Sequence, residues 1–151
     1  MNNWITTNSG KPVMPLDPKV DDIVIEDIAH ALGMICRWAG HSRTFYSVAE
    51  HSLRVGEVCR NLGEAMGMSQ TELLELEMLG LMHDATEAYV GDIPRPLKSQ
   101  YRIVTPRGVE TFREVEAHLY GVIERALGLP EMTERYAEIV HTADNIVLAT
   151  E

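Results

Sequence analysis

The sequence lacks any long hydrophobic run. No apolar stretch approaches the roughly 20 residues that an α-helix needs to cross a bilayer. The first residues, Met1-Asn2-Asn3-Trp4, do not open the basic and apolar pattern of a signal peptide. We therefore expect a cytoplasmic protein without a membrane partner.

Cysteine is also scarce, which excludes a disulfide scaffold. Cys36 and Cys59 are the only two, and neither belongs to a paired metal-binding motif. Such isolated thiols fit a reducing cytosol, where we expect both to be buried as small apolar side chains.

Positive charge is in short supply as well. Against 23 Asp and Glu the chain has 13 Lys and Arg, which gives a formal charge of -10 and a pI near 5.0. This balance argues against a protein that holds duplex nucleic acid by neutralising phosphates. A small phosphorylated substrate remains compatible, because a metal and a few arginines can make one pocket positive. At 151 residues, a single domain spanning 1–151 is the simplest organisation.

Helical periodicity dominates what is present. Residues 4 to 18 suggest two short strands around a turn, which prolines at 12, 15 and 18 confine to a minor hairpin. Apolar residues then recur every three or four positions, and capping boxes start helices at Ser47 and Ser69. The predicted helices begin near Asp21, Val48, Gln70, Thr105-Pro106 and Leu129-Pro130. The expected class is all-α, with about five or more helices and a minor N-terminal β-hairpin.

The second predicted helix runs to about Met66 and should turn an apolar face inward. The residues expected on that face are Val48, Leu53, Val55, Cys59 and Leu62.

The strongest chemical signal follows the third predicted helix. His83 and Asp84 stand side by side, and Glu87 comes three and four residues after them, which would return it to the same helical face. Imidazole and carboxylate together suit Mn, Fe, Co or Zn better than Ca or Mg. His51 and Asp144, on two other helices, would complete a set of four ligands and leave room for water and a phosphate oxygen.

Two loops carry further candidates. The segment after Cys36 holds Arg37 and Trp38, of which a guanidinium suits phosphate and an indole suits a base. The stretch from Gly91 to Lys98 contains two prolines and cannot be helical throughout.

With these residues in this order, the sequence resembles the HD-domain phosphohydrolases. The matching segments are Glu50-His51-Ser52, Met82-His83-Asp84 and Thr142-Ala143-Asp144. Arg37-Trp38 and the run from Gly91 to Lys98 resemble the subgroup that contains 5'-deoxynucleotidases and short phage-type dATP triphosphohydrolases. The resemblance covers roughly residues 21 to 150 and implies an HD-domain helical bundle.

The resemblance also implies roles for individual residues. The metal would be held by His51, His83, Asp84 and Asp144. Glu87 and Asp92 would act on the attacking water and the leaving oxygen. Substrate would contact Arg37, Trp38, Asp92, Ile93, Pro94, Arg95 and Lys98.

The implied function is metal-dependent hydrolysis of deoxynucleotides. We favour release of triphosphate from a dNTP of the dATP type, because the chain adds the cation Arg95. The alternatives are a 5'-deoxynucleotidase that acts on dNMPs and a non-catalytic module for nucleotide binding or oligomerisation. The resemblance implies one divalent transition metal (Co, Mn, Zn or Fe), a second ion such as Mg with a triphosphate, and a homo-oligomer in a bacterial or phage-infected cytoplasm.

Overall fold

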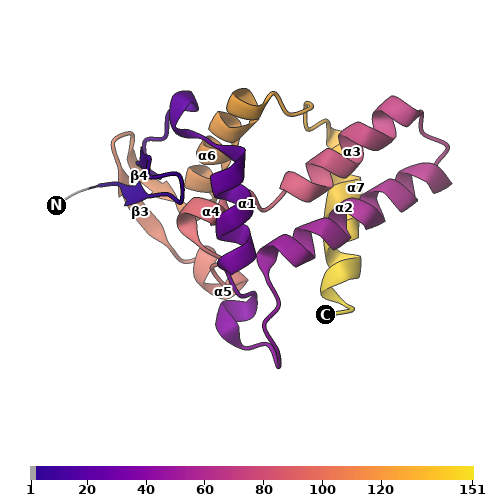
Figure 1. Cartoon of the computed structure of the whole chain (residues 1–151), viewed down its shortest axis with the longest axis horizontal. Coiled ribbons are helices and arrows are strands. Elements are labelled where there is room, and N and C mark those ends of the chain that lie inside the picture. The colour runs from indigo at the N-terminus through magenta and orange to yellow at the C-terminus, as the bar shows by residue number, and fades with distance from the viewer. Residues whose placement is uncertain (1–2) are drawn as a thin grey trace. The chain divides into compact units, whose positions relative to one another are not determined.

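The computed structural model describes residues 3–151, which fall into two compact units (Figure 1). The first unit comprises Met1–Val48 and Ala85–Gly128, and the second comprises Ala49–Asp84 and Leu129–Glu151. Both are built mainly of helices, which confirms the predicted all-α class with a minor β component. The single domain expected for residues 1–151 stays a prediction.

The elements alternate between the two units along the chain. The helices are α1 (Ile25–Met34), α2 (Val48–Ala65), α3 (Gln70–Met82), α4 (Glu87–Val90), α5 (Arg95–Lys98), α6 (Phe112–Leu127) and α7 (Glu134–Leu148). Two 3₁₀ turns are η1 (Val20–Asp22) and η2 (Trp38–Gly40). The strands are β1 (Ile5–Thr6), β2 (Pro12–Val13), β3 (Arg102–Thr105) and β4 (Gly108–Thr111), paired as two antiparallel hairpins, β1-β2 and β3-β4.

The predicted N-terminal hairpin is confirmed, and a buried carboxylate ties it to α1. Ile5 pairs with Val13 across β1 and β2. In the turn between them, the amide and hydroxyl of Ser9 donate to Asp27 at 2.6 and 2.7 Å. Burial opposes ionisation of Asp27, but these hydrogen bonds outweigh it and lower the pKa of the carboxyl.

The predicted start of a helix at Thr105-Pro106 is wrong. A second hairpin, β3-β4, occupies these residues. β3 and β4 pair with Thr105 opposite Gly108, and Val109 in β4 is 71% exposed. Proline also fits the second position of a β-turn, and the β-branched residues on both sides favour strands. The helix begins at Phe112, where Thr111 and Glu114 form a capping box.

Two other helix starts were also placed too early. A 3₁₀ turn occupies the residues around Asp21, and α1 begins only at Ile25. The last helix begins at Glu134 rather than Leu129, since Thr133 caps it by accepting a hydrogen bond from the amide of Tyr136. The start of α3 is as predicted, with Ser69 and Glu72 forming the capping box.

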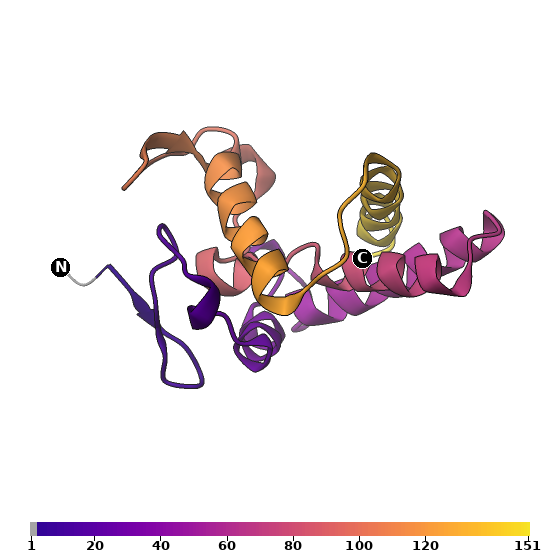
Figure 2. The ribbon, with the colours of Figure 1, turned by 90° about the horizontal axis from the view of Figure 1, so that it is seen from above.

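In the second unit, α2 and α3 run side by side (Figures 1 and 2). Glycine permits the contact, because a Cβ on Gly80 would lie 2.7 Å from the Cys59 sulfur and 3.1 Å from the Cα of Gly56. Helix α7 packs against α3 and completes the core. The buried core residues of this unit are Val55, Cys59, Met68, Leu73, Leu76, Leu79, Tyr136, Ile139, Val140, Ala143 and Val147.

The inner face of α2 differs from the prediction at one position. Val48, Val55 and Cys59 are fully buried, but Leu53 is 58% exposed. His51 and Ser52 are buried in its place, at 0% and 1% exposure. Polar side chains therefore occupy a stripe that apolar periodicity alone would assign to leucine.

Neither unit contains, within residues 3–151, a helix long and apolar enough to cross a bilayer. Of the two thiols, Cys59 is buried as expected, whereas Cys36 is only half-buried and lies 3.3 Å from the Ser42 hydroxyl. The expectation for Cys36 was therefore wrong, because a loop rather than a helix surrounds it.

We expect Gly80→Ala to destabilise the protein by about 1–3 kcal/mol, because a methyl group at the α2–α3 contact forces the helices apart. Urea unfolding followed by circular dichroism measures the change. Gly33→Ala is the matched control, since a Cβ there meets nothing within 4 Å and alanine is the better helix former. Equal free energies of unfolding for Gly80→Ala and the parent protein would contradict the close-contact interpretation.

Candidate functional site

The four predicted metal ligands lie in the second unit and come from three helices or their ends. His51 is in the first turns of α2, and Asp144 is in α7. His83 is the C-cap residue of α3, and Asp84 follows it. The helix thus ends where the two adjacent side chains can converge on one point.

The donor atoms of these residues converge. His51 Nε2 lies 3.3 Å from Asp144 Oδ1 and 3.7 Å from Asp84 Oδ2. His83 Nε2 lies 3.2 Å from Asp84 Oδ2 and 4.0 Å from Asp144 Oδ1. Donors bound at about 2.1 Å to one ion lie about 3 Å apart when adjacent and about 4.2 Å apart when opposite. Ligand atoms of His51, His83 and Asp144 all lie within 4.8 Å of one another, which fits a single shared cation, and Asp84 lies beside this group.

The two rings present the same nitrogen to this centre. Nδ1 of His83 lies 2.8 Å from the Gly80 carbonyl, and Nδ1 of His51 lies 2.8 Å from Glu151 Oε1. Both acceptors keep a proton on Nδ1, so Nε2 is the nitrogen that offers a lone pair once a metal displaces any proton it carries. The Nε2 atoms are buried, and neither makes a hydrogen bond of regular geometry. Two lone pairs buried in this way fit a metal, which would replace the missing hydrogen bonds.

The charges of the cluster shift its pKa values in opposite directions. Burial alone would lower the pKa of His83, but Asp84 and Asp144 raise it to about 9. Burial would raise the pKa of Asp144, but the neighbouring ring of His51 and the charge of His83 lower it. Without metal, a proton on His83 therefore offsets part of the carboxylate charge.

The remaining predicted residues lie in the first unit, beginning with a strained turn. Trp38 and Ala39 have φ of 60° and 52°, left-handed values that cost residues with a Cβ about 1–3 kcal/mol each. The Arg37 amide donates to the Tyr46 carbonyl at 2.9 Å, and the Trp38 amide donates to Asp92 Oδ2 at 3.2 Å. These bonds fix a conformation that leaves the indole 43% exposed.

Arg37 is buried beside this indole, with its guanidinium carbon 5.8 Å from the Trp38 ring centroid. A surface cation would instead be solvated, so burial favours a defined role. Ile93, Pro94 and Arg95 follow Asp92, and α5 begins at Arg95. Two of these three, Pro94 and Arg95, are exposed.

Glu87 is buried and pairs with Lys98. The Lys98 ammonium lies 3.1 Å from Glu87 and 2.8 Å from Glu116, and it is 5.5 Å from the ring centroid of Phe112. Burial lowers the pKa of Lys98, but the two carboxylates raise it above its ordinary value. The lysine therefore stays charged while it holds Glu87 in place.

The helical argument for Glu87 is not supported. α3 ends at Met82 and α4 begins at Glu87, with a turn between them. The His83 to Glu87 spacing therefore does not place both on one continuous helix. What distinguishes Glu87 is instead its burial and its ion pair with Lys98.

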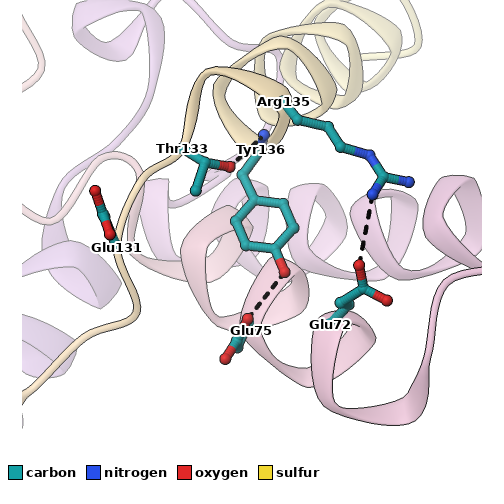
Figure 3. A pocket seen from close by; sticks show the side chains of 6 residues that line it. All are labelled: Glu72, Glu75, Glu131, Thr133, Arg135 and Tyr136. Carbon is teal, nitrogen blue, oxygen red and sulfur yellow. Dashed lines mark hydrogen bonds and ion pairs between the residues drawn. The ribbon is translucent and has the colours of Figure 1, made fainter.

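A hollow in the second unit does not involve any of the predicted site residues (Figure 3). It has a volume of about 420 Å³. It is lined by Glu72, Glu75, Glu131, Thr133, Arg135 and Tyr136. Tyr136 donates to Glu75 at 2.9 Å, and Arg135 lies 3.5 Å from Glu72. Three carboxylates against one guanidinium disfavour a phosphorylated ligand here.

Two residues at these sites escaped the sequence analysis. Glu116 lies on α6 near the apolar residues Phe112, Val115 and Leu119. A carboxylate next to this apolar stripe was the one feature of the sequence that could have indicated a buried partner for Lys98. Glu151 contacts His51 across 100 residues of sequence. No local pattern marks that contact.

Comparison with known proteins gives a family match over most of the chain. Residues 27–150 match the family described as "5'-deoxynucleotidase YfbR-like". The uncharacterized protein YfdR of Escherichia coli K12 is 40% identical over 149 residues, which cover 99% of this chain and 70% of that protein.

Two further relatives are matched over smaller shares of their length. The uncharacterized protein RCAP_rcc00048 of Rhodobacter capsulatus is 33% identical over 129 residues, 84% of this chain and 59% of the relative. The dATP triphosphohydrolase of cyanophage S-2L is 37% identical over 87 residues, 56% of this chain and 46% of the phage protein.

These matches agree with the resemblance to HD-domain enzymes and support deoxynucleotide hydrolysis as the reaction class. Enzymes of the HD type imply a divalent metal, and the cluster around His51, His83 and Asp144 has a suitable donor set. The chain belongs to the YfbR-like 5'-deoxynucleotidase family and is a phosphohydrolase of the HD type.

Proposed function

We propose that this chain hydrolyses deoxynucleoside triphosphates, releasing triphosphate, with one divalent transition metal. The observation that carries the proposal is the pair of buried Nε2 atoms facing Asp84 and Asp144 in a chain of this family. Histidine and carboxylate together favour Co, Mn, Zn or Fe over Mg or Ca. When bound, the metal supplies an activated water and positive charge for the phosphoryl oxygens.

The four ligands would hold this ion, and residues of the first unit would handle substrate. The planar guanidinium of Arg37 offers paired donors to phosphate, and Lys98 and Arg95 add positive charge. The exposed face of Trp38 offers a stacking surface for the base, beside Ile93 and Pro94. Buried Glu87 and the nearby Asp92 would accept or donate the proton at the attacking water and the leaving oxygen.

Lys98 explains why a substrate with several phosphates is favoured. Its ammonium is already held by Glu87 and Glu116, so a phosphate must compete with two carboxylates for it. A triphosphate brings more negative charge than a monophosphate and competes better. The similarity to a cyanophage dATP triphosphohydrolase supports the same choice. A second ion such as Mg would accompany the triphosphate.

A 5'-deoxynucleotidase is the second candidate, favoured by the description of the matching family. Both reactions use the same metal ligands and differ in the bond that is cleaved. We further propose that residues 1–151 act as one domain and that the protein is a homo-oligomer, since its surface offers little positive charge to enclose an anionic substrate.

Product analysis separates the two candidates. With Mn²⁺ or Co²⁺ we expect dATP to yield deoxyadenosine and triphosphate, resolved by ion-exchange chromatography. His83→Ala serves as the inactive blank. Release of inorganic phosphate from dAMP, with dATP left intact, would assign the monophosphatase reaction instead. Lack of turnover on any deoxynucleotide at full metal occupancy would support the non-catalytic module.

The role of Glu87 can be separated from the metal ligands. We expect Glu87→Gln to lower kcat about 10²–10⁴-fold, the range for loss of a general acid or base, while metal affinity stays the same. Glu116→Gln is the matched control, because Glu116 also pairs with Lys98, and a much smaller loss is expected. Similar kcat values for both variants would show that Glu87 acts only through the ion pair.

The charge of His83 predicts how metal binding depends on pH. Its pKa is raised to about 9 in the metal-free protein, and a metal must displace that proton from the ring. Mn²⁺ affinity should therefore rise up to about tenfold per pH unit between about pH 7 and pH 9, and then level off. Calorimetry in buffers of different ionisation enthalpy counts the protons released. An affinity that is constant over this range would contradict the assigned charge.

A further inference from the structure

We propose that Glu151 is a positioning residue that fixes the tautomer and orientation of His51, so that Nε2 of this ring faces the metal ligands. The inference rests on the metal site of the proposed function. It concerns a residue that touches neither metal nor substrate.

The contact is short and buried. Glu151 Oε1 lies 2.8 Å from Nδ1 of His51, and the side chains are 3% and 0% exposed. An ionised carboxylate only accepts hydrogen bonds, so this contact places the shared proton on Nδ1 of the ring. The lone pair of the ring is then on Nε2, which lies 3.3 Å from Asp144 Oδ1.

One segment supplies the groups on both sides of this ring. Asp144 in α7 faces Nε2, and Glu151, two helical turns later in sequence, faces Nδ1. After α7 the backbone stays bonded to the helix, because the amides of Thr150 and Glu151 donate to the Val147 carbonyl at 2.9 and 3.2 Å. His51 thus lies between two carboxylates, one within α7 and one in the turn that the Val147 carbonyl holds at the end of this helix.

The other histidine supplies an internal comparison. His83 donates from Nδ1 to the Gly80 carbonyl, a neutral acceptor in its own helix. His51 has a carboxylate acceptor, which makes a stronger hydrogen bond than a neutral carbonyl does. Loss of Glu151 should therefore affect His51 and leave the hydrogen bond from His83 to Gly80 unchanged.

The first test is metal affinity, measured by calorimetry with Mn²⁺. Loss of an outer partner of a metal-bound histidine weakens metal binding about 10–100-fold, and we expect this of Glu151→Ala. Glu151→Gln should recover most of the affinity, because its amide oxygen also accepts from Nδ1. Glu138→Ala, at an exposed position of α7, is the matched control and should bind as the parent does.

The second test needs no metal. In ¹⁵N-histidine NMR spectra of the metal-free protein, we expect His51 in the parent to carry its proton on Nδ1. In Glu151→Ala it should become a mixture of tautomers while His83 does not change. A purely structural role for Glu151 would lower the thermal midpoint without altering the tautomer.

The outcomes are distinct. If the parent does not bind Mn²⁺, the proposed metal site fails, and the NMR spectra still decide whether Glu151 sets the ring. If the parent binds Mn²⁺ and Glu151→Ala binds within threefold of it, or keeps the parent tautomer, the inference is overturned. Failure of Glu151→Gln to recover any affinity also overturns it.

Discussion

Burial of His51 is the constraint on which the candidate metal centre depends. A polar ring with 0% exposure requires partners for both nitrogens, since each unsatisfied nitrogen would cost about 1–3 kcal/mol. Glu151 satisfies Nδ1, while Nε2 has carboxylate oxygens nearby but no regular hydrogen bond. The core around α2, α3 and α7 therefore stabilises an arrangement that suits a bound cation.

The first unit also buries a charged side chain, and it compensates that charge with residues of its own. Glu87 is buried, and Lys98 compensates it with help from Glu116. The strained turn at Trp38 is held by Asp92 through a backbone amide. Two acids that the sequence marks as catalytic thus also maintain local structure.

Local rules predicted much of this structure and failed where one signal had two meanings. The Ser69 capping box placed α3 correctly because cap and acid are neighbours in sequence. Thr105-Pro106 fits both a helix start and a β-turn, and only the pairing of β3 with β4 distinguishes them. Order and residue type also picked out His51, His83 and Asp144, whose ligand atoms lie within 4.8 Å of one another. Glu116 and Glu151 were not recognisable, because their roles arise from contacts 18 and 100 residues away.

The negative charge of the whole chain makes locally placed cations necessary for binding an anionic substrate. The chain has a formal net charge of -10, so its surface on average repels an anionic substrate. Attraction must therefore come from a few defined positions. The cluster of His51, His83, Asp84 and Asp144 contains two carboxylates, and a divalent cation neutralises them without leaving excess positive charge. Arg37, Arg95 and Lys98 would then supply the positive charge for phosphate. On the proposed function, metal binding and substrate binding would therefore draw on separate sets of residues.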